Sequence, residues 1–146
     1  MTSRIKSNRP LSPHLTIYKP QFTSVLSIMH RLTGIGLIAS ITLIIIWFSA
    51  LAIGPGAFSF VEILFNLIVI RLLLIFSIWA LWYHTLTGIR HLIWDLGYGL
   101  DVGWIQPSAY IVLSSSICLT MITLYLGWSI WWRGLRWLLK YSRPMV

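Results

Sequence analysis

Three long apolar runs limit what this chain can fold into. The first, residues 32–53, contains no charged residue over about the twenty positions that the hydrocarbon core of a bilayer requires. The second covers about 64–88, with Arg71 near enough to its start to reach the headgroups, and the third covers about 110–132. Because 58% of the residues are hydrophobic, the chain is too apolar for a soluble domain of 146 residues. We therefore predict an all-α membrane protein, with three transmembrane helices forming an antiparallel bundle within residues 22–132.

The two ends of the chain differ in composition from this bundle. Residues 1–21 contain three prolines, which favour an extended backbone, so we predict an irregular tail that lies against the membrane surface or a partner. Residues 133–146 contain four basic residues that fall on one helical face: Arg133, Arg136, Lys140 and Arg143. This pattern predicts an amphipathic helix resting on the headgroups, and a frayed basic tail is the alternative.

The charge of the chain favours membrane lipid over nucleic acid. Eleven Lys and Arg residues against three Asp and Glu give a net charge of +8, and the basic residues lie outside the apolar runs or at their ends. That distribution suits anionic headgroups, and we expect no nucleic-acid partner. The basic tail before the first span places the N-terminus on the inner side, although basic residues are nearly balanced between the two sides. Cys118 is the single cysteine, which excludes a disulfide framework or an iron–sulfur site built by this chain.

A polar stretch follows the second apolar run. If residues 83–98 are helical, His84, Gly88 and His91 lie on one face, because steps of four and seven residues return to the same side of a helix. A histidine within the bilayer, with a glycine one turn away, gives a flat group room to approach the backbone. The alternative is a histidine that only hydrogen-bonds to a neighbouring helix.

Antiparallel packing predicts which polar residues share a level in the membrane. We expect six to lie together near one surface: Ser27, His30, Arg31, Arg90, His91 and Asp95. His84 precedes Arg90 by six residues and so lies about 9 Å deeper. At that depth an imidazole suits a haem iron. We expect no second histidine at this depth on another span, so ligation by two histidines needs a partner subunit.

The polar level itself has two interpretations. Arg31 and Asp95 can form an ion pair that only holds the first two spans together. Alternatively, Ser27 and Arg31, one turn apart, offer hydrogen-bond donors to the carbonyl oxygen of a greasy molecule with a small polar head.

Two stretches resemble known signatures. Residues 9–18 (Arg-Pro-Leu-Ser-Pro-His-Leu-Thr-Ile-Tyr) and 27–34 (Ser-Ile-Met-His-Arg-Leu-Thr-Gly) resemble the first signature of the cytochrome b556 subunits of succinate dehydrogenase, and residues 84–98 resemble the second. The resemblance implies a membrane anchor of complex II, not catalytic on its own. Its partners would be a second hydrophobic anchor, an iron–sulfur subunit and a flavoprotein subunit, and electrons from succinate would pass through the iron–sulfur subunit to ubiquinone.

The resemblance also implies residue roles. His84 would be an axial ligand of one haem b, with the other ligand from the partner anchor, and His30 and Arg31 would lie near the haem propionates. Ser27 and Arg31 would line the quinone site, and Asp95 would orient Arg31. The membrane would be a bacterial cytoplasmic membrane or the mitochondrial inner membrane, with the N-terminus on the cytoplasmic or matrix side. Alternatives are an anchor of a quinol:fumarate reductase and a haem-free structural or transporter subunit.

Overall fold

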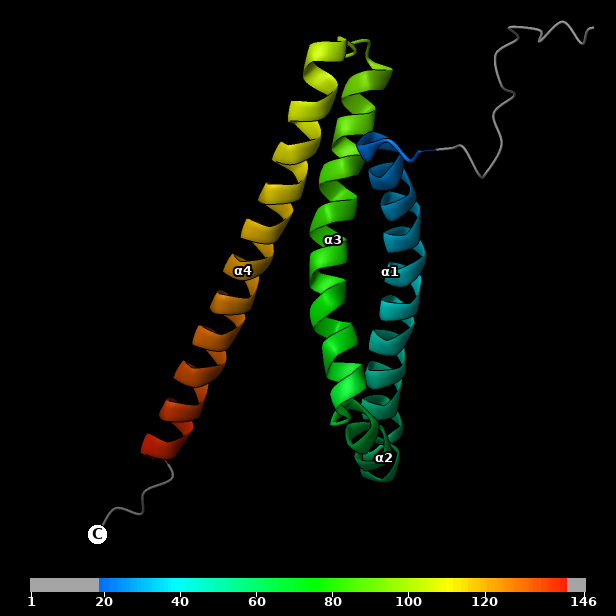
Figure 1. Ribbon diagram of the computed structural model, residues 1–146. Helices are drawn as coiled ribbons and strands as arrows, with labels where there is room; N and C mark the ends of the chain where they lie inside the picture. Colours follow the sequence, from blue (N-terminus) through cyan, green and yellow to red (C-terminus); the bar gives the residue numbers. More distant parts are fainter. Residues whose placement is uncertain (1–18, 142–146) are drawn as a thin grey trace, which may run out of the picture.

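The computed structural model describes residues 19–141, and for residues 132 and 134–141 only the helical backbone. Within that range the chain forms four helices and no strand: α1 (Phe22–Ile53), α2 (Pro55–Phe65), α3 (Ile68–Asp95) and α4 (Val102–Tyr141). Three segments are long and apolar enough to cross a membrane: α1, α3 and Val102–Trp131 of α4. They alternate in direction, as Figure 1 shows, so the predicted three-span all-α architecture is confirmed.

The first turn of the chain is made by Gly54 and Pro55. Gly54 has φ +132°, a backbone conformation that L side chains rarely adopt, and it ends α1. Pro55 then starts α2. Proline lacks an N–H, and the first position of a helix has no use for one, because an N–H there has no acceptor within the helix. The sequence predicted this end of the apolar run, but it did not predict α2. At the other end, α1 begins at Phe22, so His30 and Arg31 are already helical.

The polar stretch occupies the last turns of α3, which continues past Gly88 to Asp95. Gly97, with φ +84°, ends the helix in a Schellman motif. In this motif the Tyr98 N–H donates to the Ile93 carbonyl at 3.2 Å, and the Gly97 N–H donates to the Trp94 carbonyl at 2.8 Å. The residues of the second signature are thus held in one rigid helix end.

Helix α4 is longer than the predicted span. It begins at Val102 and not near residue 110, it includes Pro107, and its backbone stays helical to Tyr141. The first part of the predicted amphipathic C-terminal helix is therefore a continuation of α4. The side chains of Arg136 and Lys140, and all of Arg143, lie outside the described residues, as does most of the predicted N-terminal tail. The position of either end on a membrane surface stays a prediction.

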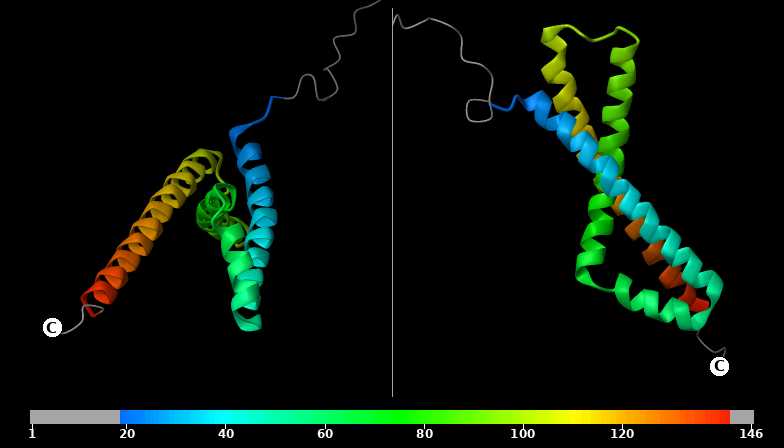
Figure 2. Two further views of the ribbon diagram at one scale, coloured as in Figure 1. Left: turned by 90° about the horizontal axis from the view of Figure 1, so that it is seen from below. Right: turned by 90° about the vertical axis from the view of Figure 1, so that its right-hand side faces the viewer.

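The core that joins the three long helices is small and lies toward one end. Leu26 of α1, Tyr83 of α3 and Ala109 of α4 are buried together, and the Tyr83 hydroxyl donates to the Leu26 carbonyl at 2.8 Å. Farther along, the Trp82 indole N–H donates to Thr123 Oγ1 at 2.9 Å. Beyond this region α4 diverges from α3, in Figure 1 and in the left view of Figure 2. Most large apolar side chains face outward, which suits lipid or other membrane subunits.

Candidate functional site

Three histidines gather where α1 faces α3. The His30 ring is stacked on the His84 ring with centroids 4.1 Å apart and an interplanar angle of 21°, and its centroid lies 5.3 Å from that of His91. We call these three residues the histidine cluster. Its geometry confirms that His84 and His91 share one face of α3, and a side-chain atom at Gly88 would also face His30, at 4.0 Å from its Nε2.

The expectation that His84 has no histidine at its own depth on another span is wrong. His30 lies at that depth, because α1 begins ten residues before the charge-free run and so brings His30 into the helix opposite His84. The sequence argument treated residues before position 32 as part of the boundary. A charged residue near a span end does not end a helix, since its side chain can reach the headgroups.

Hydrogen bonds from α1 fix the His84 ring. Its Nδ1 lies 3.0 Å from the His30 carbonyl oxygen and 3.3 Å from Thr33 Oγ1. The carbonyl oxygen can only accept, so Nδ1 carries the proton and donates. The Thr33 hydroxyl itself donates to the same carbonyl at 2.9 Å, which leaves its oxygen free to accept from Nδ1. The Nε2 atom of His84 consequently keeps its lone pair, the arrangement usual for a histidine that ligates a metal.

This site fits a metal that brings most of its own ligands. In the described part of the chain, no three His, Cys, Asp or Glu side chains converge in a way that could hold a bare ion. One oriented imidazole is what a haem requires from each axial side. In addition, His30 Nε2 is buried and has no hydrogen-bond partner within residues 19–141, so an unsatisfied polar atom lies beside the His84 ring.

His30 does not complete the axial ligation of such a group. The His30 and His84 rings are stacked face to face, so only one of the two imidazoles would hold a haem iron. A second ligand would therefore have to come from elsewhere, as the sequence suggested on other grounds.

Ser27 lies in a cavity of about 240 Å³ at the same end of the molecule. The cavity is formed between α1, α3 and the start of α4, and is lined by Thr23, Leu26, Ser27, Thr87, Arg90, His91, Trp94 and Ile105. The structure thus brings Ser27 together with Arg90 and His91, as antiparallel packing predicted. Arg31 is not among the lining residues.

Arg31 and Asp95 are both exposed. They form no ion pair with each other, and no ion pair joins any side chains among the residues for which the structure describes them. The interpretation of this pair as a boundary salt bridge within the chain is not supported. A role for Asp95 in orienting Arg31 stays a prediction.

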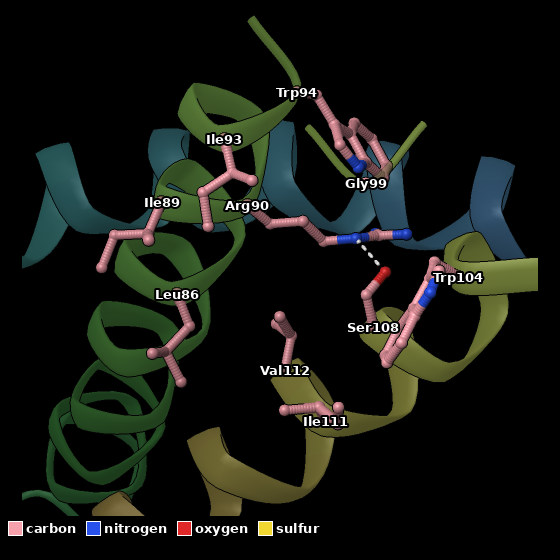
Figure 3. Close-up of a pocket in the computed structure, with 10 residues that line it drawn as sticks. All are labelled: Leu86, Ile89, Arg90, Ile93, Trp94, Gly99, Trp104, Ser108, Ile111 and Val112. Atoms are coloured by element: carbon pink, nitrogen blue, oxygen red, sulfur yellow. Dashed lines mark hydrogen bonds between the residues drawn. The ribbon is translucent and has the colours of Figure 1, made fainter. Parts of the chain in front are cut away.

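Arg90 lies at the expected level, but its side chain makes contacts with α4 that the sequence did not predict. It is only 7% exposed and extends from α3 to α4, where Nε donates to Ser108 Oγ at 2.9 Å and Nη2 donates to the Ile105 carbonyl at 2.7 Å. Its guanidinium carbon lies 4.0 Å from the centre of the Trp94 ring. Figure 3 shows this side chain reaching from α3 to Ser108, where it lines a largely apolar cavity of about 270 Å³. Arg90 therefore joins α3 to α4.

Sequence reasoning missed two features of the site. It did not identify Thr33 as a contact of His84, although Thr33 lies in the first signature stretch, nor did it link Arg90 to Ser108. Residue spacing along α3 shows which side chains share a face, but it does not show which neighbouring helix each face meets.

Comparisons with known proteins agree with this architecture. Residues 5–123 match the family described as succinate dehydrogenase/fumarate reductase transmembrane subunit. The chain is 41% identical over 119 residues to the succinate dehydrogenase cytochrome b556 subunit of Paracoccus denitrificans, covering 82% of this chain and 92% of the relative. It is 39% identical over 118 residues to the cytochrome b556 subunit of Rickettsia typhi, covering 81% and 92%. It is 38% identical over 126 residues to the cytochrome b560 subunit of Marchantia polymorpha, covering 82% and 91%.

Taken with three apolar helices and an oriented imidazole inside the bundle, these matches show that the chain belongs to the family of succinate dehydrogenase/fumarate reductase transmembrane subunits.

Proposed function

We propose that this chain is the cytochrome b anchor of a succinate dehydrogenase, which holds one haem b together with a second anchor subunit and helps to form the site of ubiquinone reduction. The observation that carries the proposal is the orientation of His84. Its Nδ1 is held by α1 at 3.0 Å from a backbone carbonyl, so Nε2 is the atom available to iron. The relatives carry the names cytochrome b556 and cytochrome b560, which agree with a haem ligand at this position.

His84 would hold the haem from this chain, and the partner anchor would supply the other axial ligand. When bound, the haem supplies a one-electron redox centre inside the membrane. His30 and Arg31 would lie near the haem propionates, where the exposed guanidinium of Arg31 would supply a positive charge.

The quinone would bind near Ser27. The cavity beside Ser27 is lined by residues of both α1 and α3, and the Ser27 hydroxyl can donate a hydrogen bond to a quinone carbonyl oxygen. Arg31 lies one turn farther along α1 and would stabilise the negative charge that develops on the quinone as it is reduced. Because Arg31 is exposed in this chain, the iron–sulfur subunit or the partner anchor would complete the site around it, and Asp95 would orient it there.

The assembly we propose contains a flavoprotein and an iron–sulfur subunit on the cytoplasmic or matrix side, with the N-terminus of this chain on that side. The membrane is a bacterial cytoplasmic membrane or the mitochondrial inner membrane. The chain is not catalytic on its own in this proposal. The family includes fumarate reductase anchors, but the three relatives compared above are all succinate dehydrogenase subunits, which favours oxidation of succinate.

A reduced-minus-oxidised absorbance spectrum of the purified complex tests haem binding. We expect a b-type signal that His84→Leu removes or shifts, whereas His91→Leu, in the same cluster but without the Nδ1 contacts of His84, retains it. An unchanged spectrum in the His84 variant would assign the ligand to another residue.

The quinone site is tested by comparing two activities of one variant. We expect Arg31→Leu to lower electron transfer from succinate to ubiquinone while transfer to an artificial acceptor, which bypasses the anchors, stays intact. Arg71→Leu is the matched control, because Arg71 is also exposed but lies in the first turn of α3, at the end away from His91 and the proposed quinone site. Equal loss of both activities in the Arg31 variant would indicate an assembly defect and would remove the support for a quinone role.

A further inference from the structure

The close approach of α1 to the His84 ring occurs at a glycine. A Cβ atom added at Gly34 would lie 2.9 Å from Cε1 of His84, 3.5 Å from Nδ1 and 3.8 Å from Nε2. The first of these distances is shorter than a carbon–carbon contact allows, so any side chain at position 34 must displace the ring. No comparable constraint exists two residues later, because a Cβ at Gly36 meets nothing within 4 Å.

The residue before Gly34 supplies the polar half of the same contact. Thr33 is 5% exposed, and its Oγ1 lies 3.3 Å from Nδ1 of His84 while it donates to the His30 carbonyl at 2.9 Å. Three other threonines of the described residues also bond their own helix, among them Thr42, whose Oγ1 donates to the Ile38 carbonyl at 2.9 Å. Thr33 differs from Thr42 because its oxygen also meets a ring on another helix, as the oxygen of Thr123 meets the Trp82 indole.

We infer that Thr33 and Gly34 of α1 are positioning residues that set the place and the donor strength of the His84 imidazole toward iron. Gly34 leaves the space in which the ring lies, and Thr33, with the His30 carbonyl, accepts the Nδ1 hydrogen bond. The inference rests on the proposed function, since it assigns a consequence to a haem ligand. Neither residue touches the iron in this view; each acts through His84.

The two residues should have different effects on a bound haem. Loss of the space at Gly34 moves the ring, so it lowers the occupancy of the haem or changes its spectrum. Loss of the Thr33 hydroxyl removes one acceptor from Nδ1 and makes the imidazole a weaker donor, which disfavours the ferric state and raises the midpoint potential. The net worth of one hydrogen bond corresponds to about a threefold change in the ferric-to-ferrous ratio, or about 30 mV for a one-electron couple.

The test uses the assembled complex and five variants of α1, and it measures the haem per complex, the absorbance spectrum and the midpoint potential. Gly34→Ala is compared with Gly36→Ala, and Thr33→Val with Thr42→Val, so each pair makes the same chemical change on one helix. We expect Gly34→Ala to lower haem content or shift the spectrum while Gly36→Ala does neither. We expect Thr33→Val to raise the potential, Thr33→Ser to restore it and Thr42→Val to leave it unchanged.

The inference is overturned if both site variants match their controls while the wild-type complex contains haem. If the Gly34→Ala complex does not accumulate, the Thr33 series decides: a raised potential with recovery in the serine variant supports the inference, and an unchanged potential overturns it. A wild-type complex without a b-type signal is a separate result, because it refutes the proposed function itself and the inference with it.

Discussion

The contact between Arg90 and Ser108 can be measured as an energy. Arg90 of α3 donates through Nε to Ser108 Oγ at 2.9 Å, and both side chains also donate to the Ile105 carbonyl, at 2.7 and 3.0 Å. Arg90→Met alone would change the free energy of unfolding in two opposing ways: the hydrogen bonds are lost, and the cost of burying a charge is removed. A double-mutant cycle with Ser108→Ala isolates the pair, because the cost of burying the charge cancels between the two sides of the cycle.

The size of the coupling follows from the kind of bond. Hydrogen bonds between membrane helices average about 0.6 kcal/mol and reach about 1.7 kcal/mol, while a charged donor places a bond near about 1.5–3 kcal/mol in soluble proteins. Since Arg90 is charged, 7% exposed and near a helix end, we expect a coupling of about 1–2 kcal/mol, roughly a five- to thirty-fold change in the unfolding equilibrium. The neutral Trp82–Thr123 bond at 2.9 Å between the same helices should couple more weakly, by about 0.6 kcal/mol.

Unfolding of the full chain by sodium dodecyl sulfate in mixed micelles, followed by tryptophan fluorescence, measures these couplings. The chain has nine tryptophans, so the emission follows the unfolding of the whole chain. Arg71→Met combined with Ser108→Ala is the control. Arg71 and Arg90 are separated by about 28 Å along α3, and such distant changes should be additive. A coupling for Arg90 and Ser108 no larger than that of the control would refute the view that this arginine joins α3 to α4.

Two further predictions concern the fold. Tyr83→Phe removes a hydroxyl that donates to the Leu26 carbonyl at 2.8 Å, so it should lower the free energy of unfolding by about 0.5–1.5 kcal/mol. The control Tyr125→Phe, at a residue that is 71% exposed, should leave that free energy unchanged. Equal effects of the two variants in the same micelle assay would contradict a role for the buried bond. Gly97→Ala places a side chain at φ +84° and should destabilise the protein by about 1–2 kcal/mol. The control Gly127→Ala, inside α4 with open space where the new Cβ would lie, should stabilise the protein by about 0.5–1 kcal/mol. Effects of the same sign would show that a side chain does not strain the Schellman motif at the end of α3.

Much of the histidine cluster could be predicted from residue spacing, and its key contact could not. Helical periodicity placed His84, Gly88 and His91 on one face, and the structure turns that face to α1. The same reasoning placed His30 near the surface, because it judged the start of the first helix by where charge ends. The helix in fact begins at Phe22, so the His30 ring stacks on the His84 ring with centroids 4.1 Å apart.

The polar residues near Asp95 show the same division. Antiparallel order correctly predicted that Ser27 would lie beside Arg90 and His91, since order and direction alone decide which ends meet. It did not predict that Arg90 turns toward α4 while Arg31 stays exposed. Rotation of a helix about its own axis, which decides such contacts, depends on packing against all neighbours at once.

By itself the sequence determined that this chain crosses a membrane three times, because the length and hydropathy of a run are local properties that a bilayer reads directly. It also determined where the first span ends, through Gly54 and Pro55. Only the tertiary structure decided that α1 supplies the acceptors of His84 Nδ1 and that Gly34 leaves room for the ring. Those contacts depend on how closely two helices approach each other and on how each is rotated about its own axis. Neither quantity can be read from the local sequence, because the residues that meet are about 50 positions apart.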